Sequence, residues 1–189
     1  MSLERLQSHR LELVLMGAEF LEALVVGDAS HAAHIGGLHI PDPRIFSPRL
    51  LRMRLHQMQT NPGIRPWLLR AIVIRESQIL CGRIGFHSAP GPEDLRDVAP
   101  DGVEIGYAVG ERFRRQGYAK EAACALMRWA FGMHRQRCFI LSISPENGAS
   151  LAMARSMGFQ EIGSHIDEED GLELYFERRF TQWPYEWNV

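Results

Sequence analysis

A strand, a glycine-containing loop and a helix follow one another directly in the middle of this chain. Residues 103–109 alternate bulky and small side chains, which predicts a half-buried strand. Apolar residues then recur at helical spacing after Gly117, and the glycine lets the backbone approach a ligand closely. The free amides of the first helical turn, with the helix dipole, favour an anion. The succession therefore predicts a phosphate-binding site where the helix begins.

The loop differs from the two best-known phosphate loops. It has neither the G-x-x-x-x-G-K-[ST] of nucleotide hydrolases nor the G-x-G-x-x-G of dinucleotide enzymes. Its residues are Arg114, Arg115, Gln116, Gly117, Tyr118 and Ala119. Read as R-x-x-G-x-A after a strand, they resemble the cofactor loop of the acetyl-CoA-dependent N-acetyltransferase (GNAT) superfamily.

Three further segments resemble the same superfamily, so the resemblance covers nearly the whole chain. Residues 8–13 resemble its opening strand, and residues 104–107 (E-I-G-Y) resemble its central strand. Residues 147–150 (N-G-A-S) and 157–159 (M-G-F) resemble its last helix and the strand after it. The E-I-G-Y and N-x-x-S sequences are most similar to the RimJ/RimL branch, which acetylates ribosomal-protein N-termini, and to its small-molecule relatives.

The order of the predicted elements matches the GNAT fold, an α+β (α/β) architecture with a mixed central sheet of about seven strands flanked by helices. The predicted helices are residues 17–27, 47–59, 117–132 and 149–157. The predicted strands are residues 9–16, 67–75, 78–87, 103–109, 138–144, 159–166 and 172–179. At 189 residues and 46% hydrophobic content, we expect one N-acetyltransferase domain over residues 1–189.

Charge and composition exclude several kinds of partner. The net charge of -2 gives no electrostatic footprint for nucleic acid or an acidic membrane. Residues 11–26 are apolar but interrupted by Glu12, Glu19 and Glu22, so we expect neither a signal peptide nor a membrane span there. A cytoplasmic location is the resulting expectation.

No metal site is expected from the cysteines or histidines. Three cysteines lie far apart in apolar runs, which favours core thiols over a disulfide framework or a zinc site: Cys81, Cys124 and Cys138. Three histidines lie in a glycine-rich stretch that reads as irregular, without nearby carboxylate or thiol spacing: His31, His34 and His39. A polar loop is the favoured interpretation of that stretch.

The resemblance implies a place for acetyl-CoA between splayed strands that end near residues 109 and 144. It implies that the backbone of Tyr107, Ala108 and Val109 pairs with the pantetheine arm. It also implies that amides from Arg115, Gln116, Gly117, Tyr118, Ala119 and Lys120 hold the pyrophosphate. The Arg114 and Arg115 side chains are further candidates for these phosphates. Asn147 is either a hydrogen-bond partner of the pantetheine arm or a helix cap.

Acetyl transfer to an amine requires a neutral amine, a polarised thioester carbonyl and a proton for the departing thiolate. Glu104 is the candidate base, and its alternative role is a structural ion pair. An amide near Val109 is placed to polarise the carbonyl. Ala154 occupies the position where many superfamily members carry a tyrosine acid. The ribosomal-protein branch resembles this chain in having a serine three residues after the asparagine, which makes Ser150 the candidate acid, with Ser144 or Tyr118 as the next candidates. The alternative for Ser150 is an ordinary serine at a helix start.

Two functions from different classes remain open. The first is an N-acetyltransferase that acts on a primary amine, either a small molecule or a protein N-terminus, through a ternary complex. The second is a non-catalytic module that binds or senses acyl-CoA. The sequence does not identify the acceptor, nor decide between an acetyl and a longer acyl group. Residues 88–102 either line a substrate entrance or form a solvated connection. Residues 183–189 are expected to pack within the chain rather than on a second subunit, and a homodimer is only a family-level expectation.

Overall fold

The computed structural model describes residues 4–167, 171–184 and 187. The chain divides into two compact units. The first contains Met1–Gly85 and Tyr107–Leu126, and the second contains Phe86–Gly106 and Met127–Asn188. One strand and one helix contribute residues to both units: β5 (Gly102–Val109) and α4 (Tyr118–His134).

Within the described residues, the strands form one mixed sheet of eight in the order β1-β2-β3-β4-β5-β6-β8-β7. This confirms the predicted mixed sheet with flanking helices. The strand that the prediction of about seven omitted is β1 (Arg5–Gln7), a three-residue element that pairs antiparallel with β2 (Leu11–Leu15). The single strand expected over residues 9–16 was therefore too long at its start. Residues 8–10 form the turn of this hairpin.

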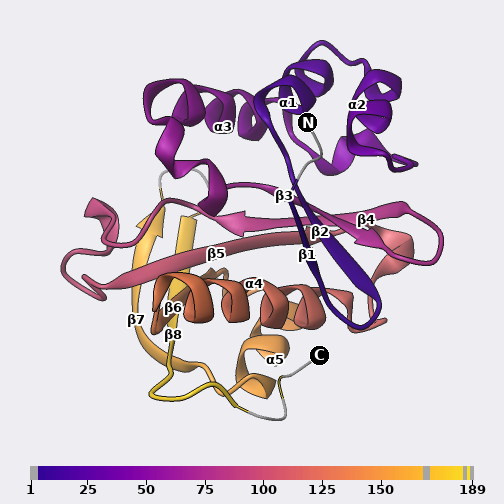
Figure 1. Ribbon diagram of the computed structural model, residues 1–189. Helices are drawn as coiled ribbons and strands as arrows, with labels where there is room; N and C mark the ends of the chain where they lie inside the picture. Colours follow the sequence, from indigo (N-terminus) through magenta and orange to yellow (C-terminus); the bar gives the residue numbers. More distant parts are fainter. Residues whose placement is uncertain (1–3, 168–170, 185–186, 188–189) are drawn as a thin grey trace. The chain divides into compact units, whose positions relative to one another are not determined.

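The first unit is an antiparallel ladder with three helices packed beside it. β2 pairs with β3 (Arg70–Ile74), and β3 pairs with β4 (Ile79–Phe86). The helices are α1 (Ala18–Val25), α2 (Ala29–Gly36) and α3 (Pro48–Thr60), and α1 contacts both of the others (Figure 1). Their apolar faces share one core with the ladder, which includes Phe20, Leu21, Leu51, Leu69 and Val73.

Helix α2 corrects the prediction of an irregular loop around His31 and His34. Asp28 caps its start by accepting a hydrogen bond from the His31 amide, and Gly37 ends it with a left-handed φ of 58°. His39 lies outside the helix and forms an isolated bridge with Ile79. Helix α3 begins as predicted, because Ser47 accepts a hydrogen bond from the amide of Leu50.

The second unit contains the remaining strands. β6 (Cys138–Ile143) is parallel to the first residues of β5 and antiparallel to β8 (Gly171–Arg179), and β7 (Gln160–Asp167) pairs antiparallel with β8. The two strands predicted over residues 159–166 and 172–179 are thus confirmed as an antiparallel pair, and residues 168–170 lie outside the described residues. Helix α5 (Gly148–Ser156) follows β6.

Helix α4 continues beyond the predicted stop at Gly132 and ends at His134. A Cβ atom at Gly132 would meet nothing within 4 Å, so this glycine has no steric role in ending the helix. Four short 3-10 helices complete the described elements: η1 (Pro43–Ile45), η2 (Pro62–Trp67), η3 (Glu93–Leu95) and η4 (Glu111–Phe113). η2 occupies the start of the strand that was predicted over residues 67–75. None of the helices in the described ranges combines the length and apolar character that crossing a membrane requires.

One face of the second unit's sheet is aromatic. Phe86 stacks with Trp129 and Phe139, at ring-centroid distances of 6.5 and 6.3 Å. Trp183 and Trp187 pack on Phe180 at 5.3 Å each, which supports the intrachain interpretation of the tail. Residues 185–186 and 188–189 of that tail lie outside the described residues. The predicted core thiols are confirmed, because all three cysteines are buried and unbridged.

Candidate functional site

The predicted phosphate loop lies in the first unit, between η4 and α4, and residues 114–117 are exposed. Arg115 and Gly117 both adopt positive φ angles, 61° and 82°. A left-handed residue directs successive backbone amides into a concave turn of the kind that binds anions. A side chain at position 117 would be strained, which explains the glycine there. The conformation therefore suits the anion that the sequence predicted.

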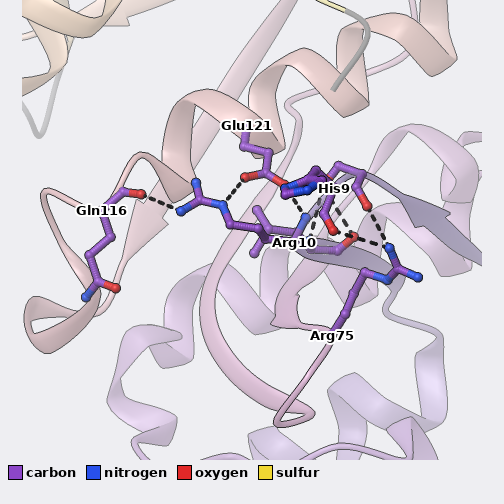
Figure 2. A network of polar contacts seen from close by, with 7 residues as sticks. His9, Arg10, Arg75, Gln116 and Glu121 are labelled. Atoms are coloured by element: carbon purple, nitrogen blue, oxygen red, sulfur yellow. Dashed lines mark hydrogen bonds and ion pairs between the residues drawn. The ribbon is translucent and has the colours of Figure 1, made fainter.

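A salt-bridge network fixes this loop from the hairpin of β1 and β2 (Figure 2). Arg10 donates from Nη1 to the carbonyl oxygen of Gln116 at 3.0 Å, and from Nε to Glu121 of α4 at 2.7 Å. The Arg10 backbone amide donates to the same carboxylate at 2.7 Å, and its guanidinium lies 4.7 Å from the Tyr118 ring centroid. Arg10 thus holds both the loop and the first turn of the helix.

Glu121 is the charged centre of this network. Burial alone would raise its pKa, but the Arg10 amide, the Ser8 hydroxyl at 2.8 Å and the Arg10 guanidinium outweigh burial and lower it. Although the side chain is only 8% exposed, these contacts keep it a carboxylate at neutral pH. Arg75 also stabilises the hairpin, because its Nη1 donates a hydrogen bond to the Ser8 carbonyl at 3.1 Å.

Tyr107, Ala108 and Val109 also lie in the first unit, at the end of β5. The backbone of β4 passes close to them, because a Cβ on Gly82 would lie 2.6 Å from the Ala108 carbonyl oxygen. The Gly110 amide donates to the Cys81 carbonyl at 2.9 Å, which fastens the end of β5 to β4. The first unit therefore brings together all the predicted cofactor residues except Asn147, including the exposed Lys120 in the first turn of α4.

Glu104 lies in the second unit, with a side chain that is 10% exposed. Its carboxylate lies 3.4 Å from Nδ1 of His87, the residue directly after β4. Burial would raise the pKa of Glu104, but the hydrogen bond and charge of His87 outweigh it, with help from Ser142 and His165. The pKa is thereby lowered, and the group is an ionised, buried carboxylate.

Asn147 and Ser150 lie at the start of α5, also in the second unit. Asn147 Oδ1 accepts a hydrogen bond from the Ser150 amide at 3.1 Å, so the helix-cap role is realised in the structure. Ser144 closes the preceding turn, because its carbonyl accepts from the Asn147 amide at 2.9 Å. Ala154 is fully buried within the same helix. Within the described residues, no cluster of histidine, cysteine or carboxylate side chains is arranged to hold a metal ion.

Sequence reasoning missed Arg10 and His87 as site residues. Arg10 contacts Glu121, and His87 contacts Glu104, only in the folded chain. No local sequence pattern predicts these contacts. The available signal was weak: a histidine at the end of a predicted strand, and an arginine in the segment that resembles the opening strand of the superfamily.

Comparison with known proteins places these features in a family. A model of the acetyltransferase (GNAT) domain matches residues 10–160. An uncharacterized N-acetyltransferase, p20, from Bacillus licheniformis is 27% identical over 99 residues, which are 52% of either chain. The chain thus spans about half the length of the curated relatives that it matches.

Solved structures share the fold at low identity. The ribosomal-protein-S5-alanine acetyltransferase from Vibrio fischeri is 12% identical with a TM-score of 0.63, covering 96% of this chain and 99% of that one. The microcin C7 self-immunity acetyltransferase MccE, solved with acetyl-CoA and AMP, is 15% identical with a TM-score of 0.59, covering 92% and 94%. The family model spans most of the chain and includes the loop, β5 and α5, and the chain therefore belongs to the GNAT acetyltransferase family.

Proposed function

We propose that this protein transfers an acetyl group from acetyl-CoA directly to a primary amine, as a single catalytic domain over residues 1–189. The observation that carries the proposal is Glu104, an ionised carboxylate in a nearly buried position. The same strand leads on to Tyr107, Ala108 and Val109 and then to the exposed glycine loop. A single strand thus connects a proton-accepting group with a segment suited to the cofactor.

The loop supports acetyl-CoA as the acetyl donor. Its left-handed residues and the start of α4 suit a pyrophosphate, and Arg114 and Arg115 are exposed beside it. The MccE structure of similar fold contains acetyl-CoA. By the family resemblance, Asn147 contacts the pantetheine arm, a role for its amide group in addition to the helix cap.

For the acceptor, we propose a primary amine that carries a positive charge before it reacts. The fold of the ribosomal-protein-S5-alanine acetyltransferase makes a protein N-terminus one candidate, and a small-molecule amine is the other. Glu104 accepts a proton from the ammonium group, and the neutral amine attacks the thioester carbonyl carbon. The carbon–nitrogen bond forms, the carbon–sulfur bond breaks, and the second amine proton passes to the thiolate through Ser150 or water, which yields coenzyme A.

The test is release of coenzyme A with a panel of amines and N-terminal peptides. We expect turnover by the wild-type protein and a loss of about 100-fold or more in kcat for Glu104→Gln. Glu161→Gln is the matched control, because Glu161 is exposed on β7 of the same unit. Its turnover should equal that of the wild type.

The alternative is a non-catalytic module that binds or senses acyl-CoA. The observation that favours it is the buried Ala154, since this helix position offers no acid to the thiolate. Calorimetric binding of acetyl-CoA without turnover of any amine would support the module and contradict the transferase. Absence of binding would contradict both.

A further inference from the structure

Polar side chains from several strands share one face of the second unit's sheet. Glu104 on β5 is in register with Ile140 on β6, and Ser142 lies two residues further along the same face. Ser142 is in register with Tyr175 on β8. His165 on β7 stacks on Tyr175 at a centroid distance of 4.3 Å and lies opposite Glu173. We call these residues, together with His87, the polar stripe.

The segment over residues 88–102 covers one end of this face. Leu95 and Ala99 pack with Cys138, Ile140 and Tyr175 in a small buried cluster. The apolar side chains of Leu95 and Ala99 therefore hold this segment against the sheet. That residues 88–102 line a substrate entrance stays a prediction.

His87 is held against Glu104 by two contacts. Its backbone amide donates to the Glu104 carbonyl at 2.9 Å, and its ring nitrogen Nδ1 lies 3.4 Å from the carboxylate. The ring lies directly over Gly106, because a Cβ there would be 2.5 Å from Nε2. Only glycine leaves room for the imidazole in this position.

The two members of the pair differ in exposure. The His87 side chain is 44% exposed, whereas that of Glu104 is 10% exposed. An acceptor that approaches this face from solvent therefore meets the imidazole before it meets the carboxylate. Imidazole is also the side chain that most often transfers protons in general acid–base catalysis.

We propose that His87 removes the proton from the acceptor's ammonium group, and that Glu104 orients the imidazole and stabilises the imidazolium. This inference rests on the proposed transferase function and changes the route of the proton. A carboxylate whose pKa is lowered is a weak base, so Glu104 acts better as the partner of a base than as the base itself.

The proton balance is complete. His87 takes one proton from the ammonium group and becomes imidazolium, paired with the Glu104 carboxylate. The neutral amine attacks the carbonyl carbon, the carbon–nitrogen bond forms and the carbon–sulfur bond breaks. The second amine proton goes to the thiolate through Ser150 or water, which yields coenzyme A. The imidazolium then releases its proton to solvent.

The charges around the pair favour a cationic acceptor. The titratable groups on or near this face include Glu104 on β5, Cys138 on β6, His165 and Asp167 on β7, Glu173, Tyr175, Glu177 and Arg179 on β8, and Asp94 on η3. The carboxylates in this set outnumber the cationic groups, even with His87 and His165 counted as charged. An ammonium group is therefore attracted to the face, and an anionic acceptor is repelled.

The experiment compares kcat/KM of the wild type, His87→Gln and Glu104→Gln across pH, with the amine that the wild type turns over best. We expect His87→Gln to lose about 100-fold or more in kcat/KM and to change the dependence of kcat/KM on pH. Acetyl-CoA binding by calorimetry should be unchanged in this variant. His34→Gln is the control, because His34 is exposed on α2.

Gly106→Ala gives a second variant that keeps the histidine. Its Cβ displaces the ring from Glu104, so we expect it to reproduce the pH profile of His87→Gln. If both variants keep wild-type kcat/KM and pH profile while Glu104→Gln loses activity, the proton passes directly to Glu104 and the inference is overturned. If the wild type binds acetyl-CoA but turns over no amine, the transferase function itself fails, and the inference fails with it.

Discussion

In the first unit, Gly82 allows the backbones of β4 and the end of β5 to come close together, because it has no side chain. A Cβ at this position would lie 2.6 Å from the Ala108 carbonyl oxygen, a backbone atom that cannot rotate away. We expect Gly82→Ala to lower the free energy of unfolding by about 1–3 kcal/mol, because β4 and the end of β5 must separate. Urea denaturation measures this change. Since Ala108 is a predicted pantetheine contact, calorimetry should also show weaker acetyl-CoA binding.

The control is another glycine-to-alanine change, Gly132→Ala, where a Cβ meets nothing within 4 Å. This residue lies inside α4, so alanine should stabilise the protein by about 1 kcal/mol through helix propensity. Equal stability effects in the two variants would show that the close approach at Gly82 does not exist in solution.

At the scale of elements, the hairpin of β1 and β2 positions the phosphate loop through Arg10. The planar guanidinium of Arg10 donates to both Glu121 and the Gln116 carbonyl, whereas the single ammonium group of a lysine cannot make both bonds in this geometry. We expect Arg10→Lys to weaken acetyl-CoA binding about tenfold, which corresponds to about 1.4 kcal/mol. The kcat at saturating acetyl-CoA should stay within about twofold, because the contacts of Arg10 hold the phosphate loop and the start of helix α4 in the first unit.

Calorimetry and steady-state kinetics check this split between binding and turnover. Arg52→Lys is the matched control, because Arg52 is exposed on α3. If Arg10→Lys melts at a lower temperature yet binds acetyl-CoA as tightly as the wild type, Arg10 stabilises the fold but does not position the phosphate loop.

The elements also show what a local pattern can and cannot predict. β5 was predicted within one residue, because its alternation of bulky and small side chains is long and regular. Helix α2 was missed, since its eight residues are rich in alanine and histidine and show no clear apolar stripe. Its boundaries were nevertheless visible in Asp28 and Gly37, which cap it at either end.

Across the whole molecule, the candidate site was predictable where it depends on one segment. Glu104 followed from the two-residue period of its strand, and Gly117 from the junction of strand and helix. The partners His87 and Arg10 were not predictable, because each meets its carboxylate only through the folding of distant segments. Sequence reasoning thus identified Glu104, but neither Glu121 nor the contacts that set the protonation of these two carboxylates.

Because of these protonation states, the free energy of unfolding should fall at both acidic and alkaline pH. Glu104, Glu121 and Asp101 have lowered pKa values in the folded state, the last through its bonds to Arg179. Their contribution is present above the unfolded pKa of about 4 and is lost as pH falls through the folded values. The unfolded chain then binds more protons, so each proton of difference lowers the free energy of unfolding by about 1.4 kcal/mol per pH unit.

The thiols act at the opposite end of the pH scale. Burial raises the pKa of Cys81 and Cys138 to about 12. Their contribution is complete below the unfolded pKa of about 8.5 and is lost as pH rises toward the folded value, because the unfolded thiols ionise first. Urea denaturation from pH 3.5 to 10 should therefore give a plateau between about pH 5 and 8.5, with losses on both sides. Cys81→Ala should flatten the alkaline loss and leave the acid limb unchanged, and an unaltered alkaline limb would contradict the role of buried thiols.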